Sequence, residues 1–248
     1  MKTCEYPECG CDVERAAVCP GMSFREHLAA FEQRCEAAMP QFKCAVHLCL
    51  GQEAVPEVLH ERLRPEDWLF STHRSHGHYL AKGGSEAKLW DELLGLESGV
   101  NGGYSGSQSF ADPSINFHAT AIVGGLVGVA VGAALGAKMA GSLARVVCCI
   151  GDAATEQGVF WESANFAALH RLPILFVCEH NGLSVHAPVR LRQATPLAGR
   201  AVSFGLHYGH GVEALREALA APAFLPGFVE VPCTRACKHV SAMEDLRE

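Results

Sequence analysis

The sequence predicts an α/β fold in which a mostly parallel β-sheet carries helices on both faces. Two apolar runs, residues 145–150 and 174–178, have the length and composition of buried parallel strands. Between them, residues 159–170 show the spacing of a packed helix, so this segment is a strand–helix–strand unit. The composition, 49% hydrophobic and 19% charged over 248 residues, excludes disorder as the main state.

The charge and the cysteine content narrow the class of protein. The chain has 20 Lys and Arg against 27 Asp and Glu, a formal charge of −7, and lacks the clustered cations that nucleic acid requires. Its 12 cysteines are few for this length, several lie inside apolar runs, and no apolar signal segment precedes them. We therefore expect reduced thiols, a cytoplasmic location and no nucleic-acid partner.

Residues 1–22 are expected to form a cysteine-containing leader, followed by a single domain over residues 23–248. The spacing of the leader cysteines matches none of the paired patterns of structural zinc sites. A leader with reduced thiols is therefore favoured over a small Zn²⁺ site at Cys4, Cys9, Cys11 and Cys19.

The first half of the domain predicts two helices and a short apolar run. In residues 23–38 apolar side chains recur every three or four positions and the pattern ends before Pro40, which is typical of an amphipathic helix. Residues 51–63 again have a helical pattern, and the run 68–70 follows them.

A polar cluster comes directly after this run. Histidine is normally sparse and titrates near neutrality, so several histidines beside an arginine favour an anion-binding site. Histidines that cap the next helix or form hydrogen bonds in the core are the alternative. The cluster contains His73, Arg74, His76 and His78. A Gly- and Ser-rich loop is expected further on, at residues 99–109.

Residues 119–137 form a run without charged residues that is long enough for a membrane span. The run lacks flanking cations and an aromatic belt, so we expect no membrane association. Glycine recurs at every fourth position, which lets another backbone approach one face of a helix. We therefore expect a helix at a tight helix–helix contact, as between subunits, with Gly124, Gly128, Gly132 and Gly136 on that face.

The two predicted parallel strands end in polar residues. Asp152 follows the first strand and Asn181 the second, and the carboxyl ends of parallel strands meet at one edge of the sheet, where ligands bind. Carboxylate, amide and main-chain carbonyl oxygens suit Mg²⁺ or Ca²⁺ better than zinc or iron. A magnesium ion with few protein ligands usually shares its shell with phosphate oxygens.

Gly-Asp-Ala at 151–153 followed by Asn181 resembles the thiamine-diphosphate motif. Longer blocks resemble the alpha subunit of the E1 component of 2-oxo acid dehydrogenases, which comprise the pyruvate, branched-chain and acetoin enzymes. The resemblance implies the thiamine-diphosphate-binding fold. The blocks are GDAATEQGVFWESANFAALHRLPILFVCEHN at 151–181, HLCLGQEAV at 47–55, STHRSHGHYLAKG at 71–83, GGYSGS at 102–107 and AIVGG at 121–125.

This resemblance implies which residues bind the cofactor. Asp152 and Asn181 would supply side-chain oxygens to Mg²⁺, and Leu183 its main-chain carbonyl. The diphosphate would lie against Gly151 and the main-chain amides of the next two residues, where a helix N-terminus favours anions. The remaining diphosphate ligands would be Ala153, Ala154, His73 and Arg74, the last two in place of the family's Tyr-Arg pair.

The resemblance also implies contacts to the ring and the substrate. Ala121 and Val123 would lie against the aminopyrimidine, mainly through the backbone. His47, His76 and His239 match family histidines near the substrate and the diphosphate, where they would hold a carboxylate and transfer protons.

Several family features are absent. The last Gly of GDG is Ala153, the first Asn of the NN pair is His180, and a loop histidine is replaced by Ser109. The glutamate that activates the aminopyrimidine has no counterpart in this sequence, because in this family it belongs to the beta subunit. A beta-type partner chain is implied, and we expect an α2β2-like assembly.

The expected function follows from this resemblance. The chain would be the alpha-type subunit of a two-component, thiamine-diphosphate- and Mg²⁺-dependent enzyme that decarboxylates a small 2-oxo acid. The resulting enamine would pass to an acceptor by acyl transfer or carboligation, or be protonated to an aldehyde. The alternative is a non-catalytic assembly subunit that has kept the fold.

Overall fold

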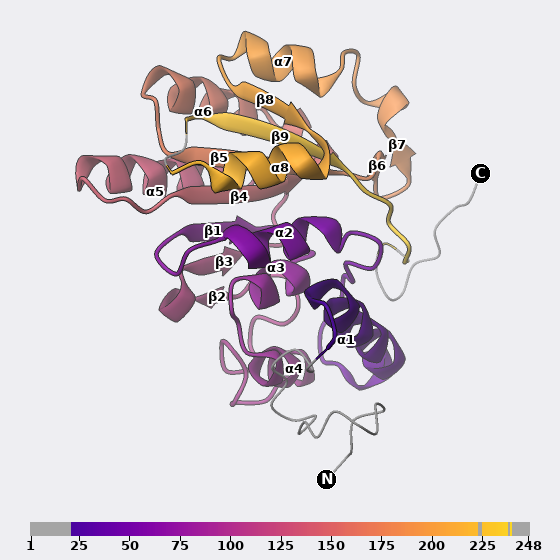
Figure 1. Ribbon diagram of the computed structural model, residues 1–248. Coiled ribbons are helices and arrows are strands. Elements are labelled where there is room, and N and C mark those ends of the chain that lie inside the picture. Colours follow the sequence, from indigo (N-terminus) through magenta and orange to yellow (C-terminus); the bar gives the residue numbers. More distant parts are fainter. Residues whose placement is uncertain (1–20, 223–224, 238, 240–248) are drawn as a thin grey trace.

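The computed structural model describes residues 21–222, 225–237 and 239. These residues fold around a seven-stranded sheet (Figure 1). The strand order is β2-β3-β1-β4-β5-β9-β8, and every pair is parallel except β2 with β3. The predicted leader cysteines lie outside the described residues. The strands are β1 (Trp68–Ser71), β2 (Ala111–Asp112), β3 (Phe117–Ala119), β4 (Val146–Gly151), β5 (Ile174–His180), β8 (His207–His210) and β9 (Gly227–Pro232).

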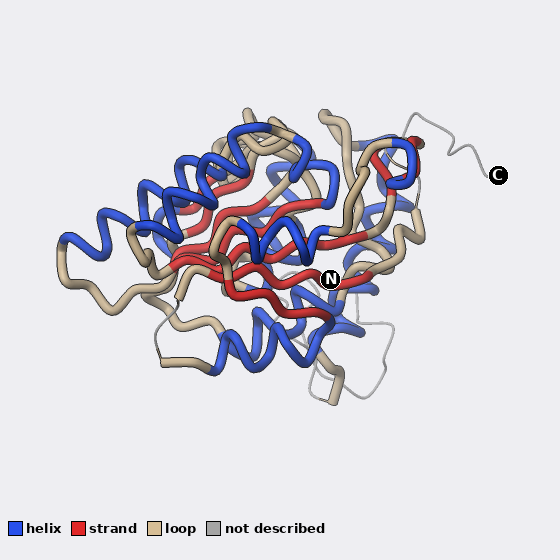
Figure 2. Tube along the Cα trace, turned by 90° about the horizontal axis from the view of Figure 1, so that it is seen from above, coloured by secondary structure: helices blue, strands red, loops and turns tan. Residues whose placement is uncertain are grey.

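Helices cover both faces of this sheet, as the sequence predicts (Figure 2). One core cluster unites α1 (Phe24–Ala38), α2 (Ala54–Arg62), α3 (His76–Ala81), α4 (Glu86–Leu94) and α8 (Gly211–Ala220). The other unites α5 (Val127–Met139), α6 (Gly158–Leu169) and α7 (Leu197–Ser203). Short pieces complete the chain: β6 (Leu183–Ser184), β7 (Ala187–Pro188), and the 3₁₀ turns η2 (Met39–Gln41), η3 (Pro113–Ile115), η4 (Asp152–Glu156) and η5 (Val189–Leu191).

Strand β4 shows how the sheet divides the two clusters. Val147 and Cys149 point into the first cluster, whereas Val146, Cys148 and Ile150 point into the second. A strand buried on both faces reads as a continuous apolar run, because its alternating side chains all leave water. The predicted strands at 145–150 and 174–178 and the helix between them are confirmed as β4, α6 and β5.

The predicted amphipathic helix over 23–38 is confirmed as α1. The Ser23 side chain accepts a hydrogen bond from the Glu26 amide, and the Glu26 carboxylate accepts one from the Ser23 amide. This capping box satisfies two amides that the first helical turn leaves without partners. The helical pattern of 51–63 corresponds to α2.

In the charge-free run at 119–137 the helix starts later than expected, whereas the expected contact with another subunit stays a prediction. Helix α5 begins only at Val127, and Gly124 lies in the preceding turn at φ +76°. Gly128, Gly132 and Gly136 are exposed, and a Cβ added to any of them would meet no atom within 4 Å. In the described part of the chain, no helix is long and apolar enough to cross a membrane.

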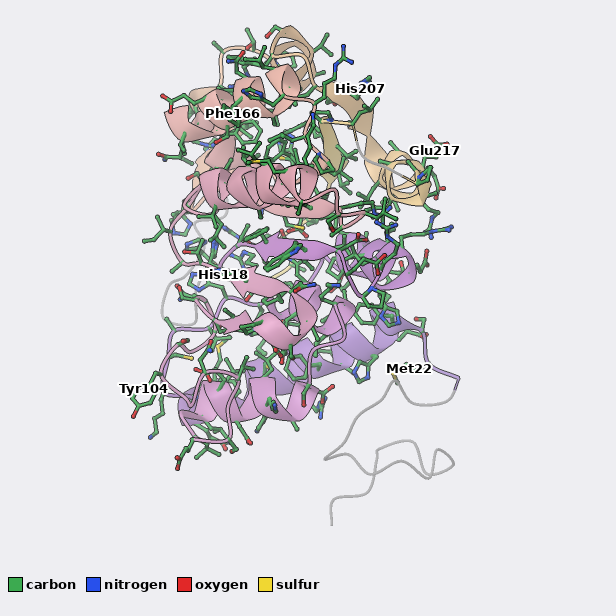
Figure 3. The ribbon with its side chains drawn as sticks, turned by 90° about the vertical axis from the view of Figure 1, so that its left-hand side faces the viewer. Met22, Tyr104, His118, Phe166, His207 and Glu217 are labelled. Carbon is green, nitrogen blue, oxygen red and sulfur yellow. The ribbon has the colours of Figure 1, made fainter. Side chains whose placement is uncertain are left out.

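The predicted loop at 99–109 is built around the buried carboxylate of Glu92. Its two oxygens accept hydrogen bonds from the amides of Asn101 (2.7 Å), Gly103 (3.0 Å), Ser105 (2.7 Å) and Gly106 (3.0 Å). Gly103 and Gly106 adopt positive φ, which residues with a Cβ rarely do. The outer turn of this loop carries Tyr104, which is 95% exposed and projects from the molecule (Figure 3).

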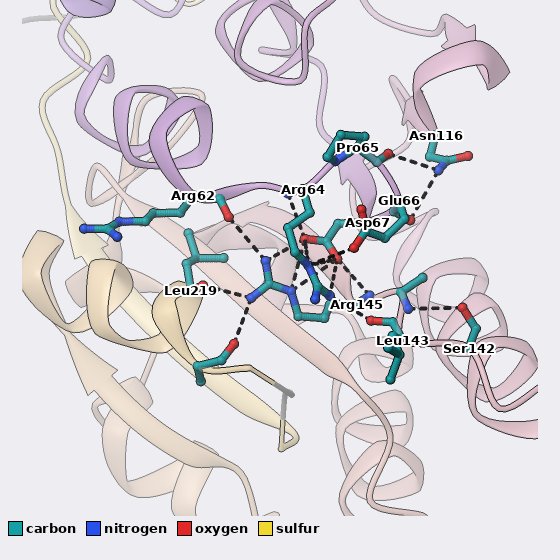
Figure 4. A network of polar contacts seen from close by, with 12 residues as sticks. Arg62, Arg64, Pro65, Glu66, Asp67, Asn116, Ser142, Leu143, Arg145 and Leu219 are labelled. Atoms are coloured by element: carbon teal, nitrogen blue, oxygen red, sulfur yellow. Dashed lines mark hydrogen bonds and ion pairs between the residues drawn. The ribbon is translucent and has the colours of Figure 1, made fainter.

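A second buried carboxylate ties together the amino ends of β1 and β4 (Figure 4). Asp67 Oδ2 accepts from Arg145 Nη2 at 2.6 Å, and Oδ1 accepts from Arg64 Nη2 at 2.9 Å. The main-chain amides of both arginines also donate to this carboxylate, each at 3.0 Å. Arg145 continues to the carbonyls of Leu219 and Ala221 and so reaches the end of α8.

Candidate functional site

A pocket with a cavity volume of about 360 Å³ lies at the carboxyl edge of the sheet, where β1, β4 and β5 end. From β1 the chain moves outward to β3 on one side, whereas from β4 it continues to β5 on the other. Such a reversal opens a crevice between two adjacent loops and is the usual ligand site of doubly wound sheets.

Most of the predicted site residues line this pocket. They are His47, His73, Arg74, Ala121, Val123, Gly151, Asp152, Ala153, Ala154, Asn181, Leu183 and His239. His76 does not line it. On α3, its Nδ1 lies 2.8 Å from Glu32 Oε1 and its Nε2 lies 2.8 Å from Ser107 Oγ, and the ring is fully buried.

The polar cluster after β1 is thus divided between two roles. His73 and Arg74 face the pocket, whereas His76 and His78 turn into the interior with α3. His78 Nδ1 lies 2.7 Å from Ser71 Oγ. Core hydrogen bonding, one of the two predicted alternatives, therefore holds for His76 and His78, whereas anion binding at His73 and Arg74 stays a prediction.

Asp152 stands where β4 ends and is 1% exposed. Its Oδ2 is 2.7 Å from Nη2 of Arg192, a residue of the segment that follows η5. The same guanidinium contacts Glu156, and its Nε donates to the Ala187 carbonyl at 3.0 Å. Among the described residues, this buried carboxylate next to the cavity thus has one ion-pair partner, Arg192, which it shares with a second carboxylate.

Asn181 follows β5 and forms a tight turn with the next residues. Its Oδ1 accepts from the Leu183 amide at 3.0 Å, and its Nδ2 donates to Gln52 Oε1 at 3.4 Å. Leu183 opens the hairpin of β6 and β7, whose turn holds Val185 at φ +53°. This conformation is unfavourable for a β-branched residue. The Arg235 guanidinium donates to the Val185 carbonyl at 2.9 Å.

Ala153 and Ala154 lie in the 3₁₀ turn η4 rather than at the start of the crossover helix α6. Gln157, at ψ 130°, separates the two segments, because an extended residue cannot continue either of them. The first amides of a helical segment have no acceptor within it. The amides of Ala153 and Ala154 therefore start a turn that borders the pocket.

Three histidine rings and a buried arginine form one wall. The ring centroid of His47 lies 4.9 Å from that of His73 and 5.1 Å from that of His239. Arg74 Nη2 donates to the His239 carbonyl at 3.0 Å, and its Nη1 donates to the Leu48 carbonyl. Burial, with the neighbouring His73 and Arg74, lowers the pKa of His47 to about 3. Burial and Arg74 likewise lower the pKa of His73 to about 4.

Another part of the pocket lining comes from apolar residues that are partly exposed to solvent. The turn before α5 contributes Ala121 and Val123, and Val123 is 48% exposed. Its neighbour Ile122 is 69% exposed, although it also lines the pocket. The Ala121 amide donates to Ser109 Oγ at 2.8 Å, which joins this part of the lining to the glycine-rich loop.

The residues present fit an anionic cofactor with a hard divalent cation. Asp152, Asn181 and the Leu183 carbonyl offer oxygen donors along one rim. Within the described ranges, Gln52 Nε2 and His47 Nδ1 are buried without a hydrogen-bond partner, and both residues line the pocket. Buried polar atoms without a partner need an explanation, and a ligand bound in the pocket would supply one. No group of three or more His, Cys, Asp or Glu that could hold a metal exists among the residues described.

Sequence reasoning missed several residues of the pocket and its surroundings, among them Gln52, Arg192 and Glu92. Gln52 belongs to the block at 47–55, but no pattern distinguishes it there. Arg192 lies 40 positions after Asp152, a separation that carries no spacing signal. Glu92 lies on the buried side of α4, where a glutamate before a glycine-rich loop is the one available hint.

The fold and the site define an α/β protein with its pocket at a switch point, and the same fold occurs in transketolase from Campylobacter jejuni. That likeness has a TM-score of 0.65 at 18% identity, and covers 86% of this chain and 38% of that one. Residues 27–210 match the family described as Dehydrogenase E1 component. The chain belongs to this family.

Curated relatives agree with this assignment. The chain is 37% identical over 173 residues to the alpha subunit of acetoin:2,6-dichlorophenolindophenol oxidoreductase of Bacillus subtilis, covering 69% of this chain and 51% of that protein. It is 34% identical over 181 residues to the alpha subunit of the pyruvate dehydrogenase E1 component of Zymomonas mobilis, covering 71% and 51%. The chain spans about half the length of these relatives.

Proposed function

We propose that this chain is the alpha-type subunit of a two-component enzyme that uses thiamine diphosphate and Mg²⁺ to decarboxylate a 2-oxo acid. The remaining fragment passes to an acceptor, by acyl transfer or by carboligation. Membership of the E1 family supports the class of reaction. The observation that carries the proposal is the convergence of Asp152, Asn181 and Arg74 on one pocket at the switch point.

Each rim of the pocket has a part in holding the cofactor. Asp152, Asn181 and the Leu183 carbonyl would bind Mg²⁺. The diphosphate would lie against the amides of η4 and the His73–Arg74 pair, supported by Gln52 Nε2. When bound, thiamine diphosphate supplies a carbon nucleophile and an electron sink for decarboxylation.

The histidine wall supports binding and proton transfer. Because burial lowers the pKa of His47 to about 3, this ring is neutral near pH 7 and can donate one hydrogen bond and accept another. His239 lies beside it and could share the substrate carboxylate with Arg235. Both nitrogens of His76 are engaged by Glu32 and Ser107, so we assign His76 a supporting role.

The open wall of the pocket suggests a partner chain. Ile122 and Val123 are exposed apolar residues at the pocket, and the glycine face of α5 is exposed beside them. Small residues at every fourth position allow close contact between helices. We propose that a beta-type subunit covers this face, supplies the activating glutamate and forms an α2β2-like assembly. Eight free cysteines among the described residues support a reducing, cytoplasmic location.

A non-catalytic assembly subunit is the second candidate. The ion pair of Asp152 with Arg192 favours it, because an arginine on the carboxylate opposes a metal ion there. Ala153 in place of glycine and His180 in place of asparagine point the same way. His180 is engaged elsewhere, since its Nδ1 lies 2.5 Å from Glu230 Oε1.

Binding of the cofactor separates the two candidates. The full chain, co-expressed with a beta-type partner, is titrated calorimetrically with thiamine diphosphate and Mg²⁺. Saturable binding is expected, and Asp152→Ala should weaken it by at least about 100-fold. Asp91→Ala is the matched control, because Asp91 does not line the pocket and accepts a hydrogen bond from Ser98. A folded complex that binds no cofactor would leave the assembly role.

A further inference from the structure

Arg192 is held against the proposed metal site from several directions. Its Nη2 is 2.7 Å from Asp152 Oδ2, its Nη1 contacts Glu156, and its Nε donates to the Ala187 carbonyl at 3.0 Å. The side chain is 10% exposed. All three nitrogen atoms of the guanidinium therefore have partners, in a planar arrangement that a lysine could not reproduce.

The segment that carries Arg192 is fastened to η4 by its neighbour. Gln193 Nε2 donates to the Asp152 carbonyl at 3.1 Å and to Glu156 Oε1 at 3.0 Å. Gln193 Oε1 accepts from Arg200 Nη2 at 2.6 Å. These hydrogen bonds of Gln193 fix the backbone next to Arg192. The contact of Arg192 with Asp152 is therefore part of the fold and not a mobile surface contact.

The two carboxylates beside Arg192 outnumber its single positive charge, which favours the binding of a cation. One guanidinium stands between two carboxylates, those of Asp152 and Glu156, which gives a net charge of −1. A divalent cation on Asp152 would meet this guanidinium at short range in a partly desolvated site, where like charges repel strongly. Glu156 is 29% exposed and offers the guanidinium a partner other than Asp152.

We propose that Arg192 competes with the divalent cation for Asp152 and thereby sets the cation affinity of the site, with Glu156 as the arginine's alternative partner. The inference rests on the proposed function, because it assumes that Asp152 is a metal ligand. The arginine neutralises a buried carboxylate when no cation is bound. Cation binding moves the guanidinium towards Glu156. The affinity of the site for the cation is therefore lower than it would be without Arg192.

Two substitutions are expected to act in opposite directions. Arg192→Gln removes the competitor and should tighten binding of the cation by about 10-fold. Glu156→Gln removes the alternative partner, leaves Arg192 to Asp152 alone, and should weaken binding several-fold. In the double variant the effect of Glu156→Gln should largely disappear, because its action passes through Arg192.

The measurement uses the full chain co-expressed with its beta-type partner, with Mn²⁺ as the probe and thiamine diphosphate present, and follows free Mn²⁺ by electron paramagnetic resonance. Arg190→Gln is the matched control, since Arg190 is an exposed arginine two positions away. Circular dichroism confirms that each variant is folded, and Arg192→Lys keeps the charge where Arg192→Gln fails to fold. Because a lysine keeps the charge but not all three contacts, the affinity of Arg192→Lys should lie between those of the unmodified chain and of Arg192→Gln.

The outcomes distinguish this inference from the proposed function. Tighter binding by Arg192→Gln and weaker binding by Glu156→Gln support the competition. If the unmodified chain binds Mn²⁺ and Arg192→Gln binds equally or more weakly, the competition is wrong and Arg192 instead supports the geometry of Asp152. If neither the unmodified chain nor any variant binds, the proposed function itself fails, and the competition with it.

Discussion

Two buried aspartates at opposite edges of the sheet have arginine partners, but they differ in how completely they are satisfied. Asp67, before β1, receives hydrogen bonds from two guanidinium groups and two main-chain amides (Figure 4). Asp152, after β4, has a carboxylate that pairs with Arg192 alone among the described residues, and it faces a cavity.

This difference distinguishes an aspartate–arginine pair that supports the fold from one that leaves room for a ligand. Hydrogen-bond donors occupy both carboxylate oxygens of Asp67. Arg145 also donates to two main-chain carbonyls at the end of α8. Burial opposes ionisation, but the hydrogen bonds from Arg145 and Arg64 outweigh it and lower the pKa of Asp67 to about 2. At Asp152 oxygen capacity is left over beside a cavity, which is what a ligand requires.

The largest effect is expected from Asp67→Asn. This substitution keeps the shape but leaves Arg145, which is 3% exposed, without a buried counter-charge. We expect a loss of about 3–5 kcal/mol in the free energy of unfolding, because an unpaired buried charge costs more than its pair contributed. Urea denaturation followed by circular dichroism measures it.

The control lies next to it in the sequence. Glu66→Gln removes an exposed partner of the same Arg64, at 3.3 Å, and should cost at most about 1 kcal/mol. If the two variants lose similar stability, the Asp67 network has no special role, and the contrast with Asp152 fails.

Glu92 tests whether hydrogen bonds from main-chain amides alone can stabilise a buried carboxylate. Glu92→Gln replaces one oxygen by an amide group that faces main-chain donors instead of accepting from them. We expect a loss of about 2–3 kcal/mol and faster hydrogen exchange at residues 101–106, because buried amides lose their acceptor. Glu97→Gln, at an exposed position before the same loop, should change neither quantity. Unchanged exchange in Glu92→Gln would show that the loop is ordered by its glycines.

The centre of the fold was predictable from the sequence, whereas its periphery was not. β4 and β5 are buried on both faces, so their apolar runs identify them. β8 contains two histidines and no apolar run, since it is an edge strand that depends on pairing with β9. The glycine face of α5 was recognised, but its exposure within this chain required the structure.

The site was predictable where it follows strand ends. Asp152 and Asn181 were expected to converge because parallel strands share an edge, and both line the pocket. His73 and His76 looked alike in the sequence, and only the start of α3 directs one to the pocket and the other to Glu32. Arg192 depends on tertiary contacts between distant segments, for which a single sequence has no signal.

The last prediction concerns pH dependence, and it tests the contrast with protons instead of substitutions of carboxylates. The folded-state pKa values of His47 and His73, about 3 and about 4, lie below the value of about 6.5 in unfolded chains. Between about pH 6.5 and 4 the unfolded chain therefore binds more protons, and stability falls as pH falls, by at most about 1.4 kcal/mol per pH unit for each ring.

Asp67 cannot cause this loss. Its folded pKa is depressed to about 2, so its contribution is retained down to about pH 4 and disappears only below that. Urea denaturation at several pH values should thus show a shallower slope for the His47→Gln, His73→Gln double variant, and an unchanged slope for the exposed control His118→Gln. An equal slope in all three chains would mean that the pocket wall tolerates protonated histidines, and that the pocket edge resembles the Asp67 edge more closely than its contacts indicate.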